Sequence, residues 1–155
     1  MPDTHQTAQQ GGATETPTRD LAQWVAGVPS TDFTDRPRRW AKHAILDWFG
    51  VTLAGATDPL VGILADDALD AGEGGNARLV GRKEKVTPTI AAMINGAASH
   101  ALDYDDVNKR LHGHPTVPVV PAILALAEQK GLAGRAVVDA FIVGYETECL
   151  IGEMM

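Results

Sequence analysis

The sequence predicts an all-α fold of about six helices in one domain. Apolar residues recur three and four positions apart along most of the chain, which is the spacing of a helix that buries one face. Proline stands where several of these segments begin and glycine where they end, as is typical of helix boundaries. Strand signals are confined to at most one short run, at 77–80. A length of 155 residues suits a single domain with a real hydrophobic core.

Composition argues against several classes of protein. The net charge is −7, from 13 Lys and Arg against 20 Asp and Glu, whereas a nucleic-acid-binding protein usually carries a basic face. The lone cysteine, Cys149, excludes an internal disulfide framework and a multi-thiolate zinc site. No apolar run approaches the roughly 20 residues that span a bilayer, and residues 1–10 lack the features of a signal peptide. We therefore expect a cytoplasmic protein that binds neither nucleic acid nor a membrane.

Residues 1–18 differ from the rest of the chain. They are polar and have no periodicity, so we expect a disordered N-terminal lead-in there. The remaining residues, 19–155, form the predicted helical domain. Its first helix is short and ends before Pro29.

Two further helices follow in the first half. The pattern at Thr34 is that of an N-terminal cap, and the helix it opens ends at Gly55. The next helix starts at Asp58-Pro59 and stops at Gly72. We expect all three tryptophans to lie in the core: Trp24, Trp40 and Trp48.

A glycine-rich connection separates these helices from the second half. The connection, 72–86, fits neither the dinucleotide-binding nor the P-loop pattern, so we interpret it as a surface segment that contains the short strand. Thr87 and Pro88 then start a helix rich in small side chains. Because small side chains let helices approach closely, we expect this helix to be buried at the centre.

The last two predicted helices complete the domain. One runs over 117–130 and is capped by Gly131. The other begins near Ala133 and reaches Met155 with no stop signal. This ending leads us to expect that the helical domain continues beyond the sequence.

The densest group of chemically active side chains lies between the fourth and fifth predicted helices. Three imidazoles and three carboxylates occur there: His100, Asp103, Asp105, Asp106, His112 and His114. Histidine and clustered carboxylates are the groups that most often transfer protons near neutral pH. Loops held between rigid helices are also where catalytic groups tend to lie.

Other interpretations of this group compete with proton transfer. An EF-hand calcium loop does not fit, because Val107 and Asn108 stand where a ligand and the glycine should be. A transition-metal site could use His112, His114 and an aspartate. The structural alternative is that the aspartates cap and solvate a helix end while the histidines are merely exposed. Elsewhere, we interpret Glu146 and Glu148 as helix-surface charges.

At this group the chain resembles the MmgE/PrpD family, which includes 2-methylcitrate dehydratase and cis-aconitate decarboxylase. The resemblance rests on the sequence of residues 94–106, on His114-Pro115, and on the segments 119–128, 131–134 and 144–146. Order and spacing agree over roughly residues 20–155, most densely over 87–148.

The resemblance implies an all-helical domain joined to a smaller α/β lid domain, usually in a homodimer, that acts on a polycarboxylate without a metal or organic cofactor. Family members are roughly three times as long as this chain. The resemblance therefore implies that residues 19–155 are the first part of the helical domain, with its C-terminal half and the lid absent. On this basis we expect the 155-residue chain alone to be inactive or weak.

The leading activity is that of a hydro-lyase of the 2-methylcitrate dehydratase type. Decarboxylation of cis-aconitate, or epimerisation of an iminodisuccinate-type substrate, begins with the same proton chemistry and stays open. A non-catalytic helical module that folds with a partner chain is the alternative from another class.

The resemblance also implies roles for single residues. Asp103 and His114 match the active-site aspartate and histidine of the family, and we expect them to transfer the proton. The substrate-binding candidates are Asp106, Lys109, Arg110 and His112. Val107 stands where decarboxylase-like members carry a hydroxyl residue, and the interval from Asp106 to His114 is one residue longer than in those members. The longer interval makes His112 a rival to His114.

Overall fold

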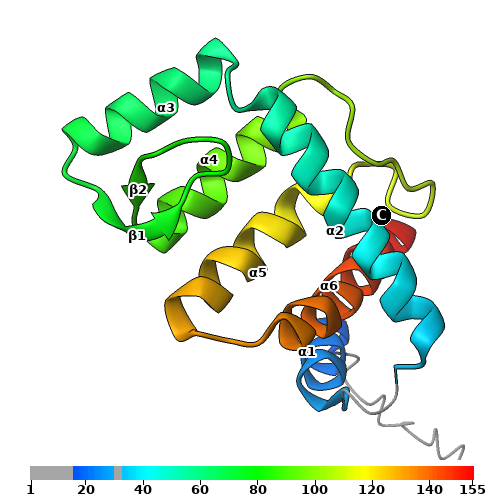
Figure 1. Cartoon of the computed structure of the whole chain (residues 1–155). Helices are drawn as coiled ribbons and strands as arrows, with labels where there is room; N and C mark the ends of the chain where they lie inside the picture. The colour runs from blue at the N-terminus through cyan, green and yellow to red at the C-terminus, as the bar shows by residue number, and fades with distance from the viewer. Residues whose placement is uncertain (1–15, 30–32) are drawn as a thin grey trace, which may run out of the picture.

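The computed structural model describes residues 16–29 and 33–155, which form six helices and one β-hairpin (Figure 1). The elements in chain order are α1 (Pro17–Gly27), α2 (Asp35–Gly55), α3 (Pro59–Asp70), β1 (Gly74–Arg78), β2 (Lys85–Val86), α4 (Pro88–His100), α5 (Thr116–Lys130) and α6 (Gly134–Met154). The predicted helical fold is confirmed. Residues 1–15 of the expected lead-in lie outside the described residues. The end of that lead-in was placed too late, because α1 already begins at Pro17.

Most helix boundaries fall where the sequence places them. The carboxylate of Asp58 accepts a hydrogen bond from the backbone N–H of Leu60 at 2.9 Å, so it caps α3 as expected. Gly131 ends α5 in the left-handed conformation, with φ of 62°. Thr87 behaves differently from the prediction. Its hydroxyl donates to Glu73 at 2.9 Å instead of capping α4, and so ties the start of α4 to the segment before β1.

The glycine-rich connection contains two strands where the sequence predicts at most one. β1 and β2 pair antiparallel, and β1 lies slightly earlier than the expected 77–80. A strand as short as β2 shows no periodicity, so the sequence alone cannot indicate it. Asn95 of α4 holds the hairpin in place: its Oδ1 accepts from the N–H of Val80 at 2.8 Å, and its Nδ2 donates to the carbonyl of Arg78 at 3.0 Å.

α4 lies at the centre of the molecule, between α2 and α3 on one side and α5 on the other (Figure 1). Its buried face consists of small or compact residues: Ala91, Ile94, Asn95, Ala98 and Ser99. The hairpin and α3 pack on this face through Val61, Leu79 and Val86. The closest approach is to α2, where a Cβ on Gly55 would overlap the carbonyl oxygen of Ala98. The prediction of a buried central helix is confirmed.

A second core joins α2, α5 and α6. Trp48, Val120 and Phe141 are buried together there. A buried ion pair supports the same contact, since Nε of Arg38 lies 2.9 Å from the Asp139 carboxylate. The expectation for the tryptophans was wrong in two of three cases, because Trp24 and Trp40 are 41% and 64% exposed.

No single helix among the described residues is long and apolar enough to cross a membrane. α2 and α3 satisfy length and composition only as a pair, and they meet at a bend of 85°.

The close approach of α2 to α4 predicts opposite effects for two glycine-to-alanine substitutions in one helix. Gly55→Ala forces the backbones apart, and we expect it to lower the free energy of unfolding by about 1–3 kcal/mol. Gly50 has open space around it, so Gly50→Ala should raise that free energy by up to about 1 kcal/mol through helix propensity. Urea denaturation followed by circular dichroism measures both. Equal effects of the two substitutions would contradict the close packing.

Candidate active site

The chemically active residues lie on the segment 101–115, which joins the end of α4 to the start of α5. His100 is the last residue of α4, and His114 lies two positions before Thr116, the first residue of α5. Asp106 fixes the far end of this segment. Its carboxylate accepts from the backbone N–H of Thr116 at 3.1 Å and from the Thr116 hydroxyl at 2.5 Å. Asp106 thus satisfies a backbone donor that the first turn of a helix leaves free.

Asp105 is the centre of the site. Its side chain is fully buried, and its carboxylate lies between two imidazole rings. Nδ1 of His100 lies 3.0 Å and 3.1 Å from the two carboxylate oxygens. Nδ1 of His114 is itself buried and lies 2.8 Å from Oδ2, although not at a hydrogen-bonding angle. The rings meet edge to face, with centroids 4.8 Å apart. One buried carboxylate therefore hydrogen-bonds His100 and lies in close contact with His114.

Asp103 stands on the open side of the same group. Its carboxylate is 78% exposed and lies 3.8 Å from Nε2 of His114. Its backbone is left-handed, with φ of 54°, a conformation that costs free energy for a residue with a side chain. Such strain is often found at functional positions. The structure thus places the two predicted proton-transfer residues, Asp103 and His114, next to each other at the surface.

The other substrate-binding candidates lie outside this group. His112 is exposed and left-handed, with φ of 56°, and Lys109 is exposed. Both belong to a tight loop that an isolated bridge between Asn108 and Gly113 closes. Asp106 points to the start of α5, as described above.

Arg110 is held by α6. Its guanidinium lies 3.0 Å from Glu146 and 2.6 Å from Glu153, and these hydrogen bonds raise the pKa of Arg110 above its usual value. The neighbouring Asn108 donates to the Tyr145 hydroxyl at 2.8 Å. We call these contacts between the loop and α6 the α6 latch. Binding of a substrate carboxylate by Arg110 would require it to leave these partners.

Two roles in the site were not predicted. His100 and Asp105 were named in the sequence as members of the group, but only the structure shows that Asp105 joins the two histidines. Glu148 was interpreted as a surface charge, yet its Oε2 is buried without a hydrogen-bond partner among the described residues. Burial, helped by the negative charge of Asp106, raises the pKa of Glu148 to about 7. Glu148 shares a helix face with Phe141 and Tyr145, and this spacing in the sequence could have indicated that Glu148 is buried.

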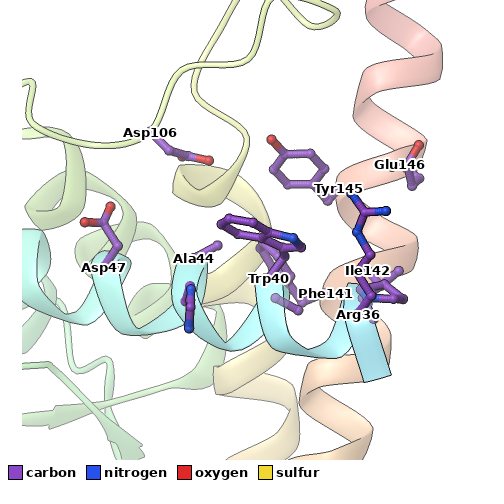
Figure 2. Close-up of a pocket in the computed structure, with 12 residues that line it drawn as sticks. Arg36, Trp40, Ala44, Asp47, Asp106, Phe141, Ile142, Tyr145 and Glu146 are labelled. Carbon is purple, nitrogen blue, oxygen red and sulfur yellow. The ribbon is translucent and has the colours of Figure 1, made fainter. Parts of the chain in front are cut away.

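A groove of about 660 Å³ lies beside the site, between α2 and α6 (Figure 2). Trp40 projects into it from α2, and Phe141 and Tyr145 line it from α6. Three carboxylates and one guanidinium stand around it: Asp47, Asp106, Glu146 and Arg36. An anionic ligand would meet mostly like charge there. The groove and the group around Asp105 are therefore separate features.

Comparison with known proteins identifies relatives of this chain. A family model described as MmgE/PrpD N-terminal domain matches residues 19–155. Cis-aconitate decarboxylase from Aspergillus terreus is 30% identical over 141 residues, which are 88% of this chain and 29% of that protein. Cis-aconitate decarboxylase from Homo sapiens is 29% identical over 136 residues, or 84% of this chain and 28% of that protein. The chain thus spans less than a third of the length of these curated relatives.

The raised pKa of Glu148 predicts how stability depends on pH. The folded chain keeps this carboxyl protonated up to about pH 7, whereas the unfolded chain releases the proton near 4.5. The contribution of Glu148 to stability is therefore present below pH 4.5 and is lost as the pH rises through 7. We expect Glu148→Gln to reduce the fall of the melting temperature between pH 4.5 and 7. Above pH 7 this variant should melt at a higher temperature than the parent.

Melting temperatures recorded between pH 4.5 and 8 test this prediction. Asp66→Asn, at an exposed carboxylate on α3, is the matched control and should keep the slope of the parent. Parallel curves for the parent and Glu148→Gln would contradict a buried, protonated Glu148.

Proposed function

Because the chain belongs to the MmgE/PrpD family, we propose that it carries the proton-transfer groups of a lyase acting on a polycarboxylate. The observation that carries this proposal is the arrangement of Asp105, His114 and Asp103. In it, one buried carboxylate orients an imidazole whose other nitrogen faces an exposed carboxylate. The whole activity is a property of the longer proteins of the family, so the reaction remains our proposal.

The chemistry of the substrate explains why such a pair is needed. In dehydration or epimerisation a base removes the weakly acidic hydrogen from a carbon beside a carboxylate, and the carbanion then expels water or takes up a proton. In decarboxylation the C–C bond breaks with release of CO₂, and an acid must protonate the carbanion that remains. A base and an acid must then lie within reach of the same carbon. His114 and Asp103 satisfy this condition, since 3.8 Å separates Nε2 from Oδ1 at the surface of the chain. Asp105 acts as a positioning residue, because it contacts the ring and is itself shielded from solvent.

Recognition of a polycarboxylate also requires positive charge. The loop supplies two cations, Lys109 and Arg110, and Arg110 is paired with the carboxylates of α6. We propose that Lys109 contacts a substrate carboxylate and that further cations come from parts of the longer protein. This is why we expect the 155-residue chain alone to turn over substrate weakly or not at all.

Decarboxylation of cis-aconitate is the first candidate reaction, because the relatives reported above carry that name. Dehydration of 2-methylcitrate is the second. It is favoured by Val107, an apolar and 70% exposed side chain next to Asp106 where decarboxylase-like members were expected to carry a hydroxyl. Both reactions make or break a bond at a carbon beside a carboxylate.

Proton NMR in D₂O tests the proposal directly. The full-length protein that includes residues 1–155 is incubated with cis-aconitate, 2-methylcitrate, citrate and an iminodisuccinate-type substrate, and deuterium entry and product formation are followed. We expect one substrate to react, and we expect Asp103→Asn and His114→Gln each to slow the reaction about 100-fold or more. The product formed identifies the reaction.

The substitution His112→Gln tests which histidine, His112 or His114, acts in the reaction. We expect it to retain activity within about threefold, since His112 lies outside the Asp105 group. If His112→Gln abolishes turnover while His114→Gln preserves it, His112 is the active-site histidine. Full activity in both Asp103→Asn and His114→Gln would overturn the proposal.

A further inference from the structure

We propose that His100, Asp103 and His114 form a binding site for a divalent transition-metal ion such as Zn²⁺, with Asp105 holding both histidines from behind. The four residues each offer a ligand atom, and these atoms all lie within 4.8 Å of one another. The inference concerns metal binding by the chain itself. It therefore does not depend on the lyase reaction proposed above.

The distances are close to those that a metal ion requires. Zinc lies about 2.0–2.2 Å from nitrogen and carboxylate ligands, which places neighbouring ligands of a tetrahedral site roughly 3.4 Å apart. Nε2 of His114 and Oδ1 of Asp103 are already at 3.8 Å. The ligand atoms that the group offers all lie within 4.8 Å of one another, so an ion would draw them together. Asp103 is exposed and His100 is half-exposed, so an ion can enter from solvent.

The position of Asp105 is the feature that distinguishes this group from a chance cluster. Its buried carboxylate contacts Nδ1 of His100 and Nδ1 of His114, which leaves Nε2 of each ring available to a ligand. A carboxylate behind a histidine is the usual outer contact of a metal-binding imidazole, because it fixes the tautomer and the direction of the ring. Here a single carboxylate serves two rings.

The donor set indicates which ions fit. Two imidazole nitrogens and one carboxylate oxygen suit Zn²⁺, Co²⁺, Ni²⁺ or Mn²⁺, whereas Ca²⁺ and Mg²⁺ prefer oxygen ligands alone. Three protein ligands at an open surface leave a position for water. An ion bound there would occupy Asp103 and His114, so it would block their proton transfer. That last consequence alone rests on the proposed function.

Isothermal titration of Zn²⁺ into the metal-free, untagged chain at pH 7.5 tests the site. We expect one ion to bind per chain. His100→Gln and His114→Gln should each weaken binding at least tenfold, and Asp105→Asn should weaken it about 10- to 100-fold through loss of the outer contact. Co²⁺ provides a second measurement, since its visible absorption reports the ligands and the geometry around the ion.

His112→Gln is the matched control, because this histidine belongs to the same segment but lies outside the group. It should bind Zn²⁺ as the parent does, and circular dichroism verifies that every variant is folded. The inference is overturned if the parent binds no Zn²⁺, if His100→Gln and His114→Gln bind as tightly as the parent, or if His112→Gln abolishes binding. If the full-length protein exchanges deuterium and the chain binds no Zn²⁺, this site alone is rejected. If the chain binds Zn²⁺ and the full-length protein exchanges deuterium on no substrate, the lyase alone is rejected.

Discussion

α4 can lie at the centre of this molecule because three of the five residues on its buried face are alanine or serine. Alanines and a serine allow the backbones of its neighbours to approach, and at Gly55 even a methyl group would not fit against the carbonyl of Ala98. Interiors packed at this density leave the central helix few alternative positions. The core formed with α3 and the hairpin includes residues of α4, whose last residue is His100. The position of the site is therefore a consequence of how closely the helices pack.

Three aspartates within four positions have three different environments. Asp103 is exposed on a left-handed backbone, Asp105 is buried between two imidazoles, and Asp106 caps α5. Each environment stabilises the negative charge in a different way. Water solvates Asp103, ring nitrogens contact Asp105, and backbone donors at the start of a helix bind Asp106. Because the three carboxylates do not share one environment, the segment can be acidic and still be well ordered against two helices.

The sequence predicts much of the fold because helix boundaries are local. Proline at the first position of a helix and glycine after its end act through the backbone of a few residues, and Pro88 and Gly131 mark real boundaries. The features that were missed depend on contacts across the chain. β2 exists only through pairing with β1, and the exposure of Trp40 depends on how α2 and α6 are placed around the groove. In the site, the pair Asp103 and His114 could be chosen by resemblance, but the central position of Asp105 depends on how α4 and α5 are placed.

The α6 latch has a mechanical consequence. Gly152, near the end of α6, lies so close to the loop that a Cβ there would come within 2.6 Å of the Leu111 backbone, and Arg110 and Asn108 are bonded to the same helix. The loop and the last turns of α6 are therefore packed directly against each other. The bridge between Asn108 and Gly113 connects this contact to the residue that follows, His114. The end of α6 is therefore in direct contact with the loop that leads to His114.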